Sequence, residues 1–343
     1  MSPSELRAFA LTAAIGFAGA LLAILISFPA PYLIGPAIAV TLASLAGLRL
    51  AVPQNVRNVC FVIVGVSMGT TVTPEVIVAA RTWPMSFVMV LVTMTVLLFT
   101  SSTLLQRLFG YDRVTSLLAS SPGHLSYVLS LAAETRCDVR TVSIAQSVRV
   151  LALTIITPII VTVLDLVDSG TILAVPVMSL PVLIGSLVAA VALGALFLRL
   201  RLPAALLLGG VFVSIATHVT GFASGAVPNW LLIPTYVILG ALIGTRFSGV
   251  SLAEVKKAAI AGAVATVAVT FIAVATAFGV SHMLDIPLDA ALIAFAPGGL
   301  ETMSAMAVML DANPTYVGAH HVLRLLFLSA LMPLALARAV RQR

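Results

Sequence analysis

Apolar residues run through this chain in long segments, and charged residues lie mainly between them. Ten segments approach the length of about 20 residues that a helix needs to cross a bilayer at roughly 1.5 Å per residue. They cover approximately residues 8–28, 31–48, 57–74, 83–105, 141–163, 178–198, 203–221, 230–247, 258–280 and 315–337. The pattern predicts an all-α integral membrane protein with about ten transmembrane helices.

Two further apolar stretches, 112–135 and 287–311, are interrupted at mid-length by Pro122-Gly123 and by Pro297-Gly298-Gly299. Each stretch is either one broken span or two half-helices that form a re-entrant hairpin. Proline fits the first turn of a helix and disrupts a helix interior. We therefore expect Pro122 and Pro297 to start a second half-helix, with Ser121 as the N-cap before Pro122.

Composition excludes a soluble enzyme. Hydrophobic residues make up 61% of the 343 residues and charged residues 9%, whereas a soluble domain has about 25% charged residues. The net charge is +6, but the 18 basic residues lie singly or in pairs between apolar segments, which predicts no nucleic-acid partner. Cys60 and Cys137 show no metal-ligand spacing, so we expect no metal and no cofactor.

The chain contains an internal duplication. When the sequence is compared with itself, Leu117–Pro158 aligns with Leu292–Pro333 at one constant offset without a gap, and eleven of these 42 positions are identical. The identities include Pro122/Pro297, Gly123/Gly298, Leu125/Leu300, Val142/Val317, Arg149/Arg324 and Pro158/Pro333. The same offset pairs Gly65-x-x-x-Gly69 with Gly240-x-x-x-Gly244. The sequence therefore predicts two membrane repeats, 1–168 and 169–343.

The distribution of basic residues predicts how the repeats are oriented. If the two interrupted stretches are re-entrant, each repeat has five spans, and the second repeat enters the membrane inverted. With both termini in the cytoplasm, the basic residues then lie on the cytoplasmic side, except Arg81, Arg149 and Arg324. Full crossings would instead move Arg136 and Arg140 outside, against the positive-inside rule. We therefore expect two inverted-topology repeats.

The candidate substrate or ion site lies where the two hairpins would meet near the bilayer midplane. Unpaired N–H groups at half-helix N-termini attract anions, and irregular backbone at that depth either packs against protein or lines a water-filled cavity. Arginines within spans mark functional paths, although they also hold hairpin carbonyls or snorkel to the interface. The residues of this candidate site are Ser121, Pro122, Gly123, Arg149, Pro297, Gly298, Gly299, Glu301 and Arg324.

Glu301 has two alternative roles. A desolvated carboxyl can bind a coupling cation or carry a proton near neutral pH. The same side chain can instead offset the positive end of its half-helix or pair with Arg324. For the repeated glycines we expect close helix packing, at Gly65, Gly69, Gly240 and Gly244.

The repeated unit resembles the AbrB family of bacterial membrane proteins over nearly the whole chain. The resemblance rests on Leu33-Ile34-Gly35-Pro36, Gly65-x-x-x-Gly69, Ser121-Pro122-Gly123, Ala296-Pro297-Gly298-Gly299-Leu300-Glu301 and the arginines 149 and 324. Family members have been catalogued as ammonia monooxygenases and as regulators of gene expression, and the family looks like a branch of the cation/proton antiporter and anion transporter superfamily. An unrelated soluble DNA-binding regulator shares the family name. The resemblance implies the bacterial cytoplasmic (inner) membrane as the location.

The sequence favours a secondary transporter of a small anionic or carboxylate-bearing solute, coupled to protons, to sodium or to neither. The alternative is a membrane-embedded regulator that affects gene expression indirectly. A monooxygenase finds no metal-ligand set, because the adjacent His320 and His321 point in different directions on a helix. The expected partners are the solute and the lipid bilayer, and the oligomeric state stays open, with a homodimer as one assembly.

Overall fold

The computed structural model describes residues 3–70, 81, 83–122, 125–135, 137–166, 176–200, 202, 204–250 and 252–341. Within these residues the chain is helical, and the one pairing of β type is an isolated bridge between Val177 and Ala226. The predicted all-α class is therefore confirmed for the described part of the chain. The helices are α1 (Pro3–Leu25), α2 (Pro31–Leu45), α3 (Gln54–Gly69), α5 (Trp83–Phe109), α6 (Arg113–Ser120), α7 (Leu125–Glu134), α8 (Val139–Val163), α9 (Leu180–Arg199), α10 (Ala205–Val219), α11 (Asn229–Gly244), η2 (Thr245–Phe247), α12 (Leu252–Leu284), α13 (Leu288–Phe295), α14 (Leu300–Met309) and α15 (Pro314–Arg341).

Each predicted apolar segment overlaps one helix, and the two interrupted stretches form the short pairs α6/α7 and α13/α14. Seven of the described helices are long and apolar enough to cross a membrane. By contrast, α2 and α10 have 15 residues each and α3 has 16. A 15-residue helix extends about 23 Å, less than the roughly 30 Å of a hydrocarbon core. Helix length therefore supports a multi-pass membrane protein but does not by itself establish ten spans.

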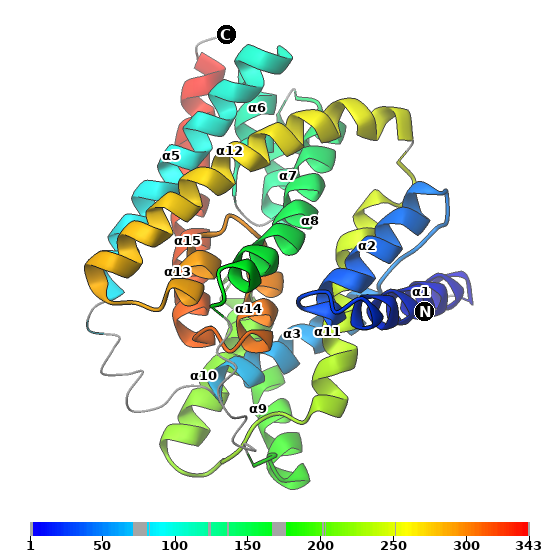
Figure 1. Ribbon diagram of the computed structural model, residues 1–343, viewed down its shortest axis with the longest axis vertical. Helices are drawn as coiled ribbons and strands as arrows, with labels where there is room; N and C mark the ends of the chain where they lie inside the picture. Colours follow the sequence, from blue (N-terminus) through cyan, green and yellow to red (C-terminus); the bar gives the residue numbers. More distant parts are fainter. Residues whose placement is uncertain are drawn as a thin grey trace.

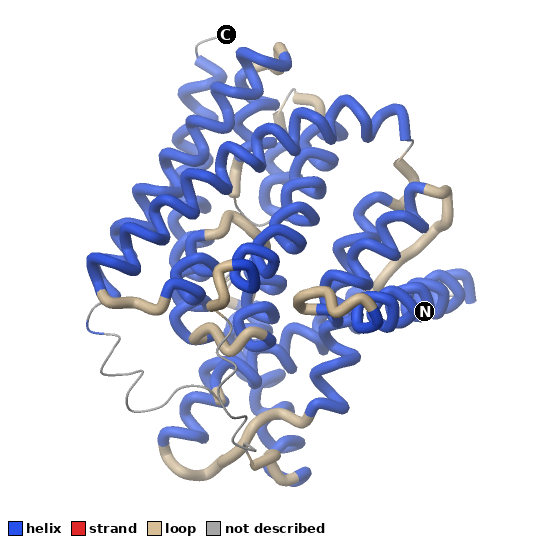
Figure 2. Tube along the Cα trace, viewed as in Figure 1, coloured by secondary structure: helices blue, strands red, loops and turns tan. Residues whose placement is uncertain are grey.

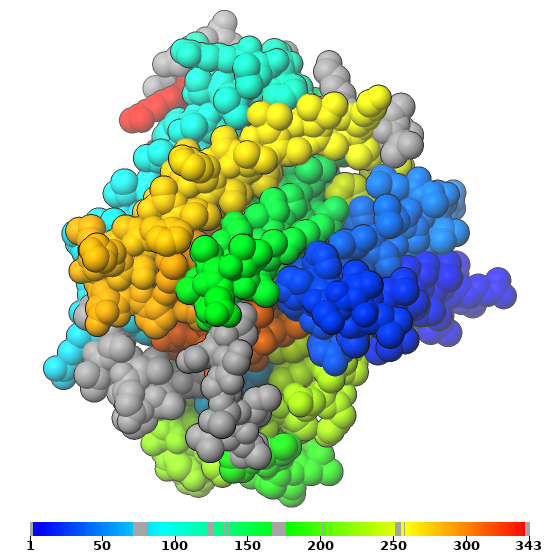
Figure 3. Space-filling view, in the orientation of Figure 1, coloured from blue at the N-terminus to red at the C-terminus, as the bar shows by residue number. Residues whose placement is uncertain are grey.

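The helices form two bundles, and each bundle draws on both halves of the chain (Figure 1). The first bundle consists of α1–α3 and α9–α11, in which α2 packs against α1 and α11, and α10 packs against α3 and α9. The second bundle consists of α5–α8 and α12–α15, in which α12 packs along α5 and α8. Figure 3 shows α8 and α12 side by side across one face. The bundles meet where α8, α14 and α15 contact α3 and α11.

Glycines bring the helices of the first bundle close together. A Cβ atom at Gly65 of α3 would overlap the carbonyl oxygen of Leu207 in α10, and one at Gly240 of α11 would overlap that of Leu33 in α2. Small residues at such crossings allow the close approach typical of membrane helices. The residues that lie at these contacts are Gly65, Gly69, Gly240 and Gly244.

Large apolar side chains cover much of the outer surface. Leu25 of α1 is 79% exposed and Phe271 of α12 is 77% exposed. Soluble proteins rarely expose contiguous apolar surface on this scale, whereas lipid tails cover it without cost. Further exposed apolar side chains on α5 and α9 include Val88, Val92, Phe99, Ile184, Val188 and Val191. The exposed surface therefore agrees with the helix lengths in indicating a membrane protein.

Candidate functional site

The two interrupted stretches each form a pair of short helices, and Figure 2 shows the loop between α13 and α14 in tan. In the first, α6 ends at Ser120 and α7 begins at Leu125; in the second, α13 ends at Phe295 and α14 begins at Leu300. Several residues of the breaks are buried: Ser121, Pro122, Ala296, Pro297 and Gly298. Gly123 of the predicted site, Arg136 of the topology argument and the predicted repeat boundary at 168/169 lie outside the described residues.

The prolines end the first half-helices and do not start the second ones, which corrects the sequence prediction. Ser121 is the C-cap of α6 and adopts an extended backbone, with φ −60° and ψ 119°. Ala296, before Pro297, likewise ends α13 with φ −60° and ψ 128°. A proline ring disfavours the helical conformation of the residue before it, so the helix stops there. The N-cap of α14 is Gly299, and the N-cap predicted at Ser121 is wrong.

Two buried arginines hold the ends of these helices. Arg149 of α8 donates from Nη1 to the carbonyl oxygen of Ser120 at 3.1 Å and from Nη2 to that of Ser121 at 2.8 Å. Arg324 of α15 donates from Nη1 to Ala296 at 2.9 Å and from Nη2 to Gly298 at 2.7 Å. The last carbonyls of a helix lack intrahelical donors, and Arg149 satisfies two of them, whereas Arg324 satisfies the C-cap carbonyl of α13 and the carbonyl of Gly298 within the break. These contacts agree with the alternative in which the arginines hold hairpin carbonyls.

The residue three positions before each arginine makes a matching contact. Gln146 donates from Nε2 to the carbonyl oxygen of Leu118 at 2.7 Å, and His321 donates from Nε2 to that of Ile293 at 3.0 Å. Both the donors and the acceptors are related by the offset that aligns the two repeats. The duplication seen in the sequence therefore recurs as the same contact in both halves of the chain.

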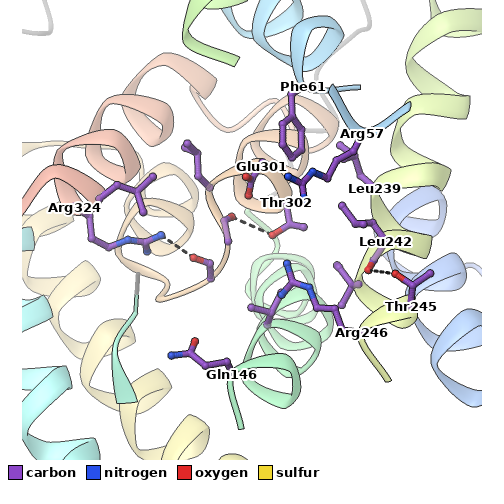
Figure 4. A pocket seen from close by; sticks show the side chains of 16 residues that line it. Arg57, Phe61, Gln146, Leu239, Leu242, Thr245, Arg246, Glu301, Thr302 and Arg324 are labelled. Atoms are coloured by element: carbon purple, nitrogen blue, oxygen red, sulfur yellow. Dashed lines mark hydrogen bonds between the residues drawn. The ribbon is translucent and has the colours of Figure 1, made fainter. Parts of the chain in front are cut away.

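A cavity of about 200 Å³ lies where the two bundles meet (Figure 4). Its walls come from α3 and α11 with η2 in the first bundle, and from α8, α14 and α15 in the second. The segment Gly298–Thr302, which contains the start of α14, lines one side. Because the first N–H groups of a helix have no intrahelical acceptor and carry a positive partial charge, this side favours an anion.

Arginines dominate the charge of this cavity. Among its described lining residues, Arg57, Arg246 and Arg324 carry positive charge and Glu301 carries negative charge. Glu301 attracts both Arg246 and Arg324, whereas Arg57 repels Arg246 and the neighbouring Arg149 repels both Arg246 and Arg324. Nη1 of Arg246 and Nε of Arg57 and of Arg324 are buried with no hydrogen-bond partner among the described groups. Guanidinium groups are strong hydrogen-bond donors to the oxygens of a bound anion.

The site predicted from the sequence does not include Arg57 and Arg246, because basic residues near helix ends match topology signals. Arg57 is in the first turn of α3, and Arg246 lies in η2 directly after α11. The one available signal was the position of Arg246 immediately after the repeated Gly240-x-x-x-Gly244-Thr245 motif. Of the predicted residues, Gly298, Gly299, Glu301 and Arg324 line the cavity, whereas Arg149 holds the break at α6.

A second polar cluster lies at the start of α5 and α15. Ser86 contacts Tyr316 through their hydroxyls, and its Oγ lies 2.8 Å from Nε2 of His320. Nδ1 of His320 lies 2.8 Å from the carbonyl oxygen of Tyr316 and therefore donates to it, so Nε2 of a neutral ring accepts from Ser86. Among the described residues, no group of three or more His, Cys, Asp or Glu side chains is placed to hold a metal ion.

The family model described as "Transition state regulatory protein AbrB" matches residues 32–340. A Bacillus subtilis (strain 168) protein named "Uncharacterized protein YhjN" is 29% identical over 291 residues, which are 79% of this chain and 75% of that protein. An Escherichia coli (strain K12) protein named "Putative regulator AbrB" is 27% identical over 309 residues, which are 88% of this chain and 87% of that protein. No solved structure matches the chain.

In the described part of the chain, the helical fold, its apolar surface and seven long apolar helices indicate a multi-pass membrane protein. Because the family model covers most of the sequence, the chain belongs to the AbrB family, and the resemblance given above is confirmed.

Proposed function

We propose that this protein is a secondary transporter that moves a small anionic solute across the bacterial cytoplasmic membrane. The observation that carries the proposal is the arginine-lined cavity between the two bundles. Arg324 is buried and Arg57 and Arg246 are half-buried, and cations inside a membrane protein are costly and commonly mark substrate or ion paths. Broken helices that direct a half-helix N-terminus at a midplane site are the form in which many transporters bind anionic groups.

The proposed topology has ten spans, two re-entrant hairpins and two inverted repeats, with both termini in the cytoplasm. The matching contacts of Gln146 and His321, at equivalent positions of the two repeats, support two equivalent units. The short helices α2, α3 and α10 would cross where the bilayer thins locally, at a modest cost in free energy. In this topology Arg57 and Arg246 lie toward the cytoplasm, and the break before α14 lies near the midplane. The cavity would then lead from the cytoplasmic side to the centre of the membrane.

Alternating access would arise from movement of the second bundle relative to the first. The cavity is built from both bundles, so a displacement of α14 and α15 past α3 and α11 changes which side reaches it. Transport of this type needs no ATP. Glu301, in the first turn of α14, is the residue we propose for proton or sodium coupling, because it lines the same cavity.

Counterflow in proteoliposomes tests the proposal. Vesicles containing purified protein are loaded with an unlabelled anion and exposed to the same labelled anion, across a panel of carboxylates and inorganic anions without ATP. We expect accumulation of at least one label with the wild type and a strong loss with Arg246→Gln. Arg338→Gln is the matched control, because Arg338 is exposed near the end of α15. Equal accumulation in all three proteins and in empty vesicles would reject transport.

A regulatory role is the second candidate, and the printed names of the family model and of the Escherichia coli relative favour it. We propose that such a role would be indirect, through the concentration of the transported solute. If the Arg246→Gln variant changes gene expression as strongly as the wild type does, the regulatory role does not depend on the cavity.

A further inference from the structure

The charge of the cavity limits which anion it can hold. Among the described lining residues, Arg57, Arg246 and Arg324 outweigh Glu301, which leaves an excess of two positive charges. Arg324 is buried and the other three charged residues are half-buried, so this excess charge is partly removed from water, which is costly unless an opposite charge pairs with it. A monoanion leaves one of these charges unbalanced, whereas a dianion balances both.

The positive charges are divided between the two bundles. Arg246 approaches from η2 in the first bundle, and Arg324 with the start of α14 approaches from the second (Figure 4). Each side thus contributes an arginine to the lining of the cavity, Arg246 from the first bundle and Arg324 from the second. A ligand with two anionic groups would therefore contact both bundles at once.

Much of the remaining lining is apolar, although Gln146, Thr245 and Thr302 also line the cavity, and the space is small. Val150, Leu242, Ile243 and Leu325 line the cavity beside the charged groups. The volume of about 200 Å³ lies below the roughly 300–1,000 Å³ typical of sites for drug-sized ligands. Apolar walls favour a short hydrocarbon spacer over a compact inorganic ion, which would leave these walls against water or empty space.

Resting on the transporter proposal, we propose that the cavity binds a short aliphatic dicarboxylate. One carboxylate lies at Arg246, where Arg57 adds positive charge, and the other lies at the N-terminus of α14 beside Arg324. Because Glu301 lowers the positive charge of the cavity by one, it sets the preferred valence at two.

Isothermal titration calorimetry on purified protein in nanodiscs tests this assignment with three organic probes of similar length and with sulfate. Succinate has two carboxylates, butyrate has one, 4-aminobutyrate pairs one carboxylate with an ammonium group, and sulfate is a dianion without a spacer. We expect succinate to bind at least 10-fold more tightly than each of the others. Arg246→Gln should weaken succinate binding by about 10- to 100-fold, the loss expected for a hydrogen bond to a charged group.

A variant of Glu301 gives a result that a merely structural role would not produce. Glu301→Gln raises the excess charge of the cavity from two to three, so it should tighten succinate binding and favour the trianion propane-1,2,3-tricarboxylate. Arg246→Lys, which keeps the charge but loses the planar fork, should give intermediate affinity. Arg338→Gln should bind succinate as the wild type does.

Each of the following results would reject a specific part of the proposal. Tighter binding of butyrate or 4-aminobutyrate would reject a dianion while leaving the transporter proposal intact. Tighter binding of sulfate would reject the hydrocarbon spacer. Unchanged succinate binding in an Arg246→Gln protein with a normal melting temperature would reject the site. Binding of none of the four probes would reject the dicarboxylate. The transporter proposal would then be tested by the counterflow panel alone.

Discussion

Replacing Arg324 with methionine tests whether the buried arginines hold the broken helices. Arg324 is 1% exposed, and its guanidinium donates to the carbonyl oxygens of Ala296 and Gly298 at 2.9 and 2.7 Å. Methionine retains most of the side-chain length but leaves both carbonyls without this donor, at about 1–3 kcal/mol each. Relief from burying the positive charge offsets part of this loss. We expect a net decrease of about 3 kcal/mol in the free energy of unfolding.

The matched variant is Arg149→Met in the first repeat, where the guanidinium donates to Ser120 and Ser121. Unfolding by SDS titration in mixed micelles, followed by circular dichroism, measures both variants. We expect similar losses of stability, but a loss of anion affinity per folded molecule mainly for Arg324→Met, because Arg324 lines the cavity. A change within about 0.5 kcal/mol of the wild type for either variant, the range of ordinary surface substitutions, would refute the reasoning.

Three further predictions concern packing, capping and topology. Gly65→Ala and Gly240→Ala should each lower the free energy of unfolding by about 1–3 kcal/mol, because the added methyl group overlaps Leu207 or Leu33. Gly185 has open space around it, so Gly185→Ala should leave the stability unchanged. Equal effects of the three substitutions would argue against the packing role. Asp138 accepts hydrogen bonds from the backbone N–H and the hydroxyl of Thr141 at the start of α8, and these bonds lower the pKa of its carboxyl below the ordinary 3.8. The contribution of Asp138 to stability is therefore present above about pH 4 and is lost as the pH falls through the lowered pKa. Asp138→Ala should lower the free energy of unfolding by about 1 kcal/mol at pH 7 and by less at pH 3. An equal loss of stability at both pH values would contradict the capping role. In a cysteine-free background, Arg107→Cys and Arg140→Cys, both at exposed positions, should react with an impermeant thiol reagent from the cytoplasmic side alone, and labelling of position 140 from outside would make the first hairpin a full span.

The sequence predicted the helices well because a long apolar run has few alternatives to a helix in a membrane. Segment 258–280, for example, lies within α12 (Leu252–Leu284), and both proline-glycine interruptions coincide with breaks. The alignment of the two repeats also singled out Arg149 and Arg324, which make equivalent carbonyl contacts. These features depend on local composition and on repetition, which a single sequence contains.

Other features depended on tertiary structure. A proline can begin one helix or end the one before it, and sequence alone did not decide between these effects at Ser121-Pro122. Arg57 and Arg246 resemble ordinary helix-end charges until α3 and α11 pack against α14 and bring both into one cavity. The missed residues are therefore those whose environment is created by contact between the two bundles.

The most direct test of the central claim is electrical current from proteoliposomes on a solid-supported membrane after an anion concentration jump. We predict a transient current with at least one small organic anion in the wild type, its loss in Arg246→Gln, and its retention in Arg338→Gln. Absence of current with every carboxylate and inorganic anion of a broad panel, or an equal current in wild type and Arg246→Gln, would contradict an anion-transport site in the cavity.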